Sequence, residues 1–94
     1  MAIVVTDSTF AKKICGQCIV YILRCNDRSI YVGCTFNIIE RLIRHRNGDV
    51  KYTSSRLPVE LVTYITFTDK YKAYEFEKYL KSGSGRAFLQ KRFL

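Results

Sequence analysis

The fold is decided by residues 18–46, which read CIVYILRCNDRSIYVGCTFNIIERLIRHR. Residues 18–25 are apolar and rich in β-branched side chains, and residues 29–33 have a similar character, which is typical of strands. The polar run at 26–28 lies between them and favours a turn, because Asn and Asp side chains bond the neighbouring backbone. The stretch therefore predicts a β-hairpin, with Tyr21 on its first strand and Tyr31 on its second.

A helix is predicted directly after this hairpin. Asn37 is a good N-cap, and Glu40 follows at the spacing of a capping box. Four apolar residues are expected to form the buried stripe of the helix, namely Ile38, Ile39, Leu42 and Ile43. Arg41, Arg44 and His45 fall on a neighbouring face, which taken alone would be a solvated basic face.

The second half of the chain predicts a polar loop at 51–57, a strand at 59–67, a helix at 70–81 and a short final helix at 86–93. The Ser-Gly-Ser-Gly run at 82–85 is expected to separate the last two helices. The order is β-β-α-β-α-α. We expect a small α+β, two-layer sandwich, in which helices pack on a three-stranded, mainly antiparallel sheet.

One domain accounts for the whole chain, because 94 residues leave no room for a second core. We expect it to span residues 18–94. Residues 1–17 are expected to be an N-terminal extension with a short strand at 3–5. The apolar run near the start is too short for the core of a signal peptide, so we expect a cytoplasmic protein.

The charge of the chain is strongly positive. Sixteen Lys and Arg residues face eight Asp and Glu residues, which gives a formal net charge of +8. Such a balance favours a polyanionic partner through counterion release. An anionic membrane is the other candidate, but no segment approaches the roughly 20 apolar residues of a membrane span. A generally soluble basic surface is the plainer alternative.

The cysteines lie at positions 15, 18, 25 and 34. Cys15 and Cys18 have the two-residue gap of a zinc knuckle or a redox pair, but no second pair matches it. Cys25 and Cys34 fall in or beside strand-like segments, where a free cysteine acts as a small apolar residue. Reduced structural thiols are therefore favoured over a zinc or redox protein.

Glu77 stands where an apolar side chain is expected. It shares the spacing i, i+3, i+4, i+7 with Ala73, Phe76 and Leu80, which is the pattern of a core-facing stripe. A carboxylate on such a stripe is costly unless something pairs with it. It either makes a salt bridge with Lys81 four residues on, or binds a hard divalent cation.

Tyr21 and Tyr31 each fit a plain structural role in a strand, but their motifs carry a family resemblance. Val20-Tyr21 and Tyr31-Val32-Gly33, followed by the helix with Arg41, resemble the two motifs and the arginine helix of the GIY-YIG nuclease superfamily. Within it, the chain resembles small single-domain proteins similar to the N-terminal incision domain of the nucleotide-excision-repair endonuclease. The resemblance covers residues 18–94.

The resemblance implies a divalent-metal-dependent endonuclease that hydrolyses DNA to 5′-phosphate and 3′-hydroxyl ends. It implies that Tyr21 is the general base, that Tyr31 orients the water or the phosphate, and that Arg41 neutralises phosphoryl charge. His45 would hold the phosphate or a tyrosine hydroxyl. Glu77 would bind Mg²⁺ or Mn²⁺.

The chain departs from the family pattern at three points. Ile19 stands where the first motif has Gly, Cys34 stands where some members carry Lys, and no Asn follows Asn47. A catalytic lysine, if used, would come from elsewhere in the chain.

DNA is the expected partner, in a structured or damaged form, and RNA remains open. Seven further residues are expected to contact it: Arg44, Arg46, Lys51, Tyr52, Arg56, Lys81 and Arg86. A larger protein assembly or a homodimer also fits, and so does a role in DNA repair. The alternative function is a non-catalytic nucleic-acid-binding module of the same fold.

Overall fold

The computed structural model describes residues 17–94. Three strands form one antiparallel sheet, namely β1 (Cys18–Arg24), β2 (Ile30–Thr35) and β3 (Glu60–Phe67). Four helices accompany it, namely α2 (Ile38–Arg46), α3 (Lys51–Ser54), α4 (Lys70–Leu80) and α5 (Gly83–Arg92). The expected α+β class, the three-stranded sheet and the order of the main elements are confirmed.

The sheet has the order β2-β1-β3, so the hairpin strand β1 lies in the centre. In the β1–β2 register, Tyr21 lies opposite Gly33 and Leu23 lies opposite Tyr31. Residues that lie opposite each other in an antiparallel pair project from the same face of the sheet. Tyr21 and Tyr31 therefore share one face of the sheet, and Gly33 of β2 lies opposite Tyr21 on that face.

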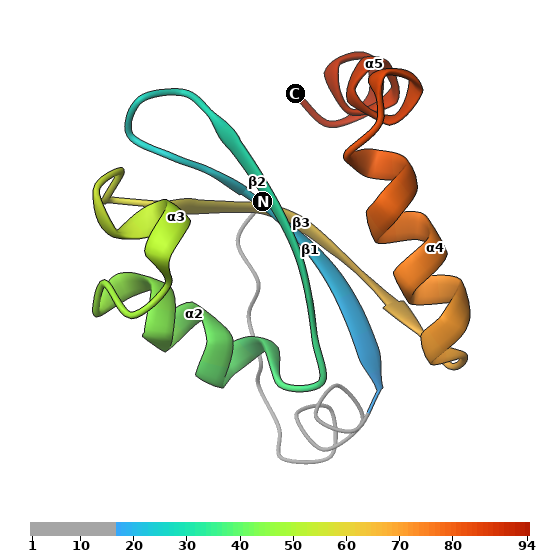
Figure 1. Ribbon diagram of the computed structural model, residues 1–94, viewed down its shortest axis with the longest axis horizontal. Helices are drawn as coiled ribbons and strands as arrows, with labels where there is room; N and C mark the ends of the chain where they lie inside the picture. Colours follow the sequence, from blue (N-terminus) through green and yellow to red (C-terminus); the bar gives the residue numbers. More distant parts are fainter. Residues whose placement is uncertain (1–16) are drawn as a thin grey trace.

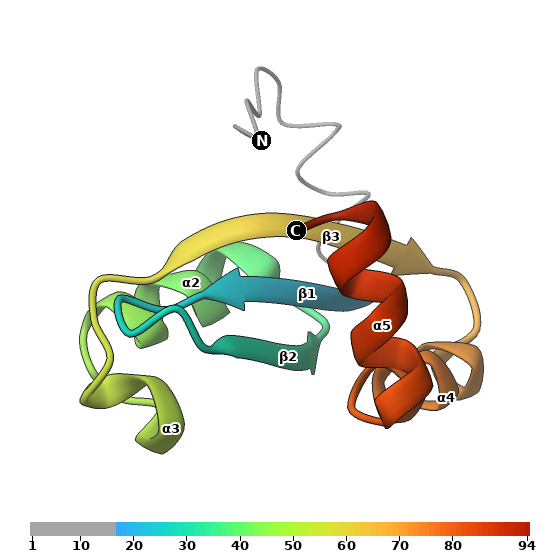
Figure 2. The same ribbon diagram turned by 90° about the horizontal axis from the view of Figure 1, so that it is seen from above.

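Both faces of β1 are apolar, and helices cover both. Tyr21, Leu23 and their neighbours pack with Ile38 of α2 on one face. Val20 and Ile22 pack with residues of α4 and α5 on the other. Figure 1 shows α2 and α3 on one side of the sheet and α4 and α5 on the other, and Figure 2 shows the same separation from above. The structure thus adds a second helical layer to the expected two-layer sandwich, because alternate residues of β1 each need apolar cover.

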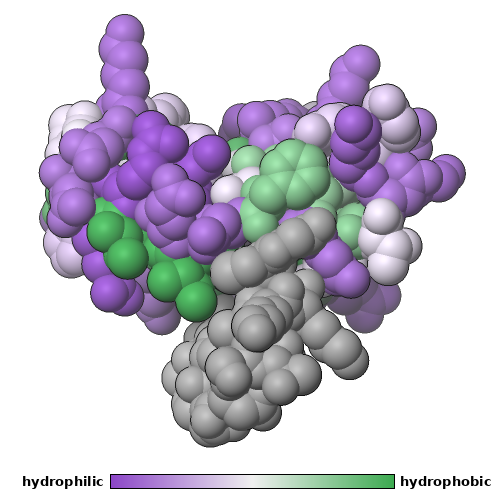
Figure 3. All heavy atoms as spheres, turned by 90° about the horizontal axis from the view of Figure 1, so that it is seen from below, coloured by the Kyte–Doolittle hydropathy of each residue, from purple (hydrophilic) through white to green (hydrophobic). Residues whose placement is uncertain are grey.

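The buried stripe of α2 differs from the prediction. Ile38 and His45 are buried, whereas Ile39 is 43% exposed and Ile43 is 50% exposed. The helix presents the i, i+4, i+7 positions of Ile38, Leu42 and His45 to the sheet, and this rotates Ile39 and Ile43 toward solvent. His45 is therefore buried against the sheet and does not lie on a solvated basic face. Figure 3 shows hydrophobic residues interrupting an otherwise largely hydrophilic face of the molecule.

Two further boundaries were wrong in the prediction. The expected loop at 51–57 begins with the short helix α3. The final helix begins at Gly83 rather than at residue 86, because Ser82 is its N-cap and its Oγ accepts a hydrogen bond from the Gly85 amide at 3.2 Å. The predicted break is thus a cap followed by the first turn of α5.

The cysteines of the described residues are free thiols. Cys18 and Cys25 are buried, and the sulfur atoms of Cys18 and Cys34 are 2.9 Å apart. Burial, and then the hydrogen bond with Cys18, raise the pKa of Cys34 to about 12. Within residues 17–94 these cysteines therefore behave as small apolar core residues. Cys15 and the expected strand at 3–5 lie outside the described residues.

The junction between α4 and α5 provides a matched pair of glycines. A Cβ at Gly85 would lie 2.5 Å from Leu80 Cα and overlap the Tyr79 carbonyl oxygen, whereas a Cβ at Gly83 meets nothing within 4 Å. Gly85→Ala is expected to lower the free energy of unfolding by about 1–3 kcal/mol or more, since backbone atoms would have to move. Gly83→Ala should leave it unchanged or raise it by up to about 1 kcal/mol.

Urea unfolding of both variants and of the wild type tests this expectation. Equal free energies of unfolding for Gly85→Ala and Gly83→Ala would show that α5 does not pack this closely against the end of α4.

Candidate active site

Tyr21 lies at the centre of the candidate site. Its side chain is fully buried on β1, on the face covered by α2. Gly33 on β2 makes this position available, because a Cβ there would lie 2.5 Å from both the Cζ and the hydroxyl oxygen of Tyr21. The glycine of the second motif thus provides space for the phenol of the first.

A buried chain of hydrogen bonds begins at the Tyr21 hydroxyl. It lies 2.9 Å from His45 Nε2, and His45 Nδ1 lies 2.7 Å from Thr53 Oγ1. The Thr53 hydroxyl donates to the Val50 carbonyl at 3.4 Å, so its oxygen accepts from Nδ1–H of His45. Nε2 of a neutral imidazole is then an acceptor, and the Tyr21 hydroxyl donates to it.

The surroundings of these hydrogen-bonded groups keep the Tyr21 and His45 side chains neutral. Burial, and then the charges of Arg41 and Arg44, lower the pKa of His45 below its ordinary 6.5. Burial, and then the neighbouring Tyr31, raise the pKa of Tyr21, while the nearby Arg41 guanidinium opposes the rise. A neutral phenol therefore donates to a neutral imidazole at pH 7. His45 is the side chain placed to accept the proton of Tyr21.

Tyr31 packs against both members of this pair. Its ring centroid lies 6.0 Å from that of Tyr21 and 5.0 Å from that of His45, with an edge-on angle of 69° to the imidazole. On its other side it meets Tyr52 of α3 at 5.6 Å. Tyr31 is only partly buried, whereas Tyr21 and His45 are fully buried, so it forms the exposed margin of the cluster.

Glu77 is not part of this cluster. It projects from α4, which packs on the opposite face of the sheet from α2. The charges of Glu77 and of Arg41 act in opposite directions on the pKa of the Cys34 thiol, so both side chains carry charge near the edge strand β2. The structure therefore joins Tyr21, Tyr31 and His45 directly, with Arg41 beside them and Glu77 across β2.

Glu77 offers one carboxylate, already paired with Lys81, as a ligand for a metal ion. Its side chain is 24% exposed and one oxygen lies 3.5 Å from Lys81 Nζ, which is the salt bridge that the sequence offers as the alternative to a metal. Among residues 17–94, no three His, Cys, Asp or Glu side chains gather as a metal-binding group. A single accessible carboxylate still fits Mg²⁺, which commonly takes one or two carboxylates, waters and substrate phosphates.

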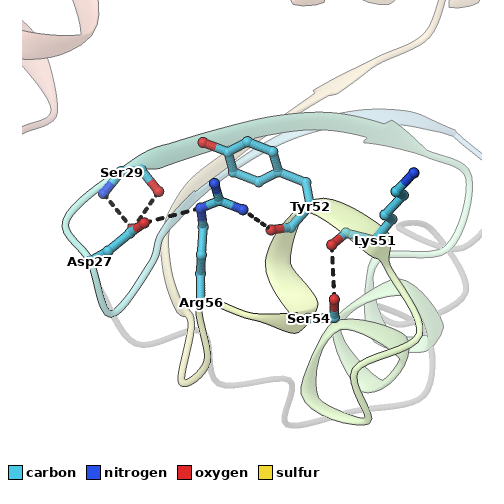
Figure 4. A network of polar contacts seen from close by, with 6 residues as sticks. All are labelled: Asp27, Ser29, Lys51, Tyr52, Ser54 and Arg56. Carbon is cyan, nitrogen blue, oxygen red and sulfur yellow. Dashed lines mark hydrogen bonds and ion pairs between the residues drawn. The ribbon is translucent and has the colours of Figure 1, made fainter.

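The residues expected to contact nucleic acid differ in whether their side chains are exposed or already paired within the protein. Arg44, Arg46, Lys51 and Arg86 are exposed. Arg56, by contrast, is held in place: its Nε lies 3.0 Å from Asp27 Oδ2, and its guanidinium carbon lies 4.1 Å from the centroid of the Tyr52 ring (Figure 4). Arg56 therefore fixes Tyr52 and the hairpin turn rather than presenting a free charge.

Sequence reasoning missed the role of Thr53. It is fully buried in α3 and its hydroxyl sets the tautomer of His45. Residues 51–57 are polar and predict a loop, so no local pattern indicates that a helical turn there would bury a hydroxyl group. Every buried side-chain nitrogen and oxygen of the described residues has a hydrogen-bond partner, which is why this polar chain is tolerated in the core.

The lowered pKa of His45 predicts a pH-dependent stability. His45 of the unfolded chain binds a proton near pH 6.5, whereas buried His45 of the folded chain binds it only at a lower pH. The free energy of unfolding should therefore fall as the pH drops through 6.5 toward the lower pKa of the folded state. His45 is the only histidine of the sequence. In His45→Gln this dependence should disappear, although the variant is less stable throughout.

Urea unfolding at about pH 7.5 and about pH 5.5 measures this dependence, since ordinary carboxyl groups titrate below that window. A wild-type stability that is constant, or that rises toward the lower pH, would contradict a buried neutral His45.

No helix within residues 17–94 has the length and apolar character needed to cross a membrane.

Comparisons with known proteins identify the family of this chain. The GIY-YIG catalytic domain family matches residues 17–91. A UPF0213 protein of Staphylococcus epidermidis is 45% identical over 64 residues, which cover 67% of this chain and 78% of that protein. A UPF0213 protein of Pediococcus pentosaceus is 38% identical over 76 residues, covering 76% of this chain and 79% of that one.

The solution NMR structure of a UPF0213 protein from Bacillus halodurans is also similar. It superimposes with a TM-score of 0.53 at 35% identity, covering 80% of this chain and 83% of that one. The family match over residues 17–91, together with the similarity to these UPF0213 proteins, shows that this chain belongs to the GIY-YIG family.

Proposed function

We propose that the protein is a divalent-metal-dependent endonuclease that cleaves DNA phosphodiester bonds, leaving 5′-phosphate and 3′-hydroxyl ends. The observation that carries the proposal is the hydrogen bond from the Tyr21 hydroxyl to His45 Nε2 at 2.9 Å. Burial, and then Arg41 and Arg44, lower the pKa of His45 and keep the imidazole neutral, so its Nε2 can accept the tyrosine proton.

Tyr21 and His45 act together as the general base. As the water attacks phosphorus, its proton passes to the Tyr21 oxygen, and the Tyr21 proton passes to His45 Nε2. The transfer leaves Tyr21 neutral, so the raised pKa of its phenol is no obstacle. The Thr53 hydroxyl accepts from Nδ1–H throughout and holds the imidazole in the required tautomer.

Tyr31 and Arg41 complete the phosphate site. Because Tyr21 is fully buried and Tyr31 lies at the exposed margin, the Tyr31 ring moves when substrate binds and lets water reach the Tyr21 hydroxyl. Arg41 neutralises charge that develops on the phosphoryl oxygens, a role suited to a planar, permanently charged group.

Glu77 is the residue that would hold Mg²⁺ or Mn²⁺, after exchanging its ion pair with Lys81 for the metal. The bound ion supplies Lewis-acid stabilisation of the phosphate and of the leaving 3′-oxygen. Lys81, the C-cap residue of α4, would then be available to contact the nucleic-acid backbone.

The basic surface provides the affinity for DNA. Arg44 and Arg46 of α2 and Lys51 of α3 are exposed and lie on the same side of the sheet as Arg41. Contacts of this kind release counterions, so binding should weaken steeply as salt increases.

A binding module without turnover is the second candidate. The Glu77–Lys81 salt bridge favours it, because a carboxylate already paired in this way has a structural explanation. The cleavage test below separates the two candidates.

Glu77→Ala is expected to abolish Mg²⁺-dependent cleavage of labelled single-stranded, duplex and branched DNA while leaving binding unchanged or stronger, since a negative charge near the phosphates is removed. Glu75→Ala is the matched control, because Glu75 lies on the same helix, is exposed and pairs with Lys72 at 3.9 Å. Cleavage by Glu77→Ala at the wild-type rate would remove Glu77 as the metal ligand. Binding without any cleavage by the wild type would favour the binding module.

A further inference from the structure

A cavity of about 540 Å³ opens beside the candidate active site. Its walls come from the hairpin turn and β2, from α3, and from the end of α4 together with α5. Its polar and aromatic lining includes Arg28, Tyr31, Tyr52, Lys81, Arg86 and Gln90. Its size falls within the usual range of small-molecule sites, about 300–1,000 Å³.

The lining combines positive charge, aromatic rings and an apolar floor. Arg28 and Arg86 are exposed, and the floor is formed by residues such as Leu80 and Leu89. No Asp or Glu of the described residues lines the cavity. A ligand that satisfies all three features carries a negative charge and a flat ring, which is the chemistry of a nucleotide.

The aromatic wall is held rigidly in place. Arg56 Nη1 donates to the Tyr52 carbonyl oxygen at 2.5 Å, while its guanidinium stacks on the Tyr52 ring. Asp27 joins the network at 3.0 Å from Arg56 and accepts from the Ser29 amide at 3.0 Å (Figure 4). The same network thus fixes the Tyr52 wall and the hairpin turn that carries Arg28.

Tyr31 connects the cavity with the candidate active site. Its ring lines the cavity, lies 5.6 Å from Tyr52 and also lies 5.0 Å from His45. A nucleotide in the cavity would therefore be a near neighbour of the phosphate cut at Tyr21.

We propose that this cavity binds one unpaired nucleotide of the strand that the enzyme cuts, with its base against Tyr52 and its phosphate between Arg28 and Arg86. The proposal rests on the proposed nuclease function and defines its substrate class: single strands, and duplexes with unpaired or branched segments. A base inside an intact duplex must first be unpaired and unstacked before it can enter, whereas an unpaired base incurs no such cost.

Binding of a fluorescein-labelled single strand, and of the same sequence as a blunt duplex, tests the proposal. Fluorescence anisotropy without metal separates binding from cleavage. Tyr52→Leu should weaken single-strand binding about tenfold or more, because it removes a stacking surface. Arg86→Gln, an exposed change on α5 that does not disturb packing, should weaken it through loss of a phosphate contact. Neither variant should weaken duplex binding to the same extent.

Tyr71→Leu on α4 and Arg92→Gln on α5 are the matched controls, since they make the same substitutions at exposed residues that do not line the cavity. The proposal is overturned if the cavity variants weaken single-strand binding no more than these controls, or weaken both forms of DNA equally. It is also overturned if thymidine 5′-monophosphate binds as tightly as the strand, since the cavity would then serve a free nucleotide.

Metal-dependent cleavage by the same wild-type preparation distinguishes the two proposals. Cleavage together with unaltered binding by Tyr52→Leu and Arg86→Gln removes the nucleotide cavity and keeps the nuclease. Loss of single-strand binding in these variants, without cleavage by the wild type, keeps the cavity and removes the nuclease.

Discussion

The hydrogen bond between the Tyr21 hydroxyl and His45 Nε2 orients helix α2 against the sheet. It joins the central strand β1 to helix α2 inside the core, where a polar group without a partner would be costly. Each neighbouring feature follows from it: Gly33 leaves room for the phenol, and Thr53 supplies the second partner of the imidazole. Stability and the proposed chemistry therefore use the same buried contact.

The central position of β1 explains how so small a chain can assemble a site. Its alternate residues are covered by helices on both faces: α2, which carries Arg41, packs on one face, and α4, which carries Glu77, packs on the other. The hairpin turn and α5 then enclose the cavity beside that edge. In the proposed function, the chemistry lies on the α2 face, and the metal approaches from the α4 face.

Much of the fold was predictable because its signals are local. The hairpin and the Asn37 cap of α2 follow from alternation and capping patterns, and the structure confirms them. The burial of His45 was not predictable, since only the tertiary approach of α2 decides which stripe faces the sheet. The role of Ser82 was mispredicted for a different reason. A Ser-Gly run predicts a break between helices, but it also suits the N-cap and first turn of a helix.

The site residues also differ in whether a local sequence pattern predicts their role. The motif spacing brought Tyr21, Tyr31 and Arg41 to notice, whereas Thr53 and Arg28 matter only through contacts between distant segments. Arg56 read as a free cation, but its partner Asp27 lies 29 residues away in the sequence, beyond the reach of any local pattern.

The most direct measurement is the ¹⁵N–¹H NMR spectrum of the imidazole, which is unambiguous because His45 is the only histidine. We expect a neutral ring at pH 7, protonated at Nδ1 and unprotonated at Nε2, which accepts from Tyr21. A ring protonated at Nε2, or an imidazolium at that pH, would show that His45 cannot receive the tyrosine proton and would contradict the proposed relay.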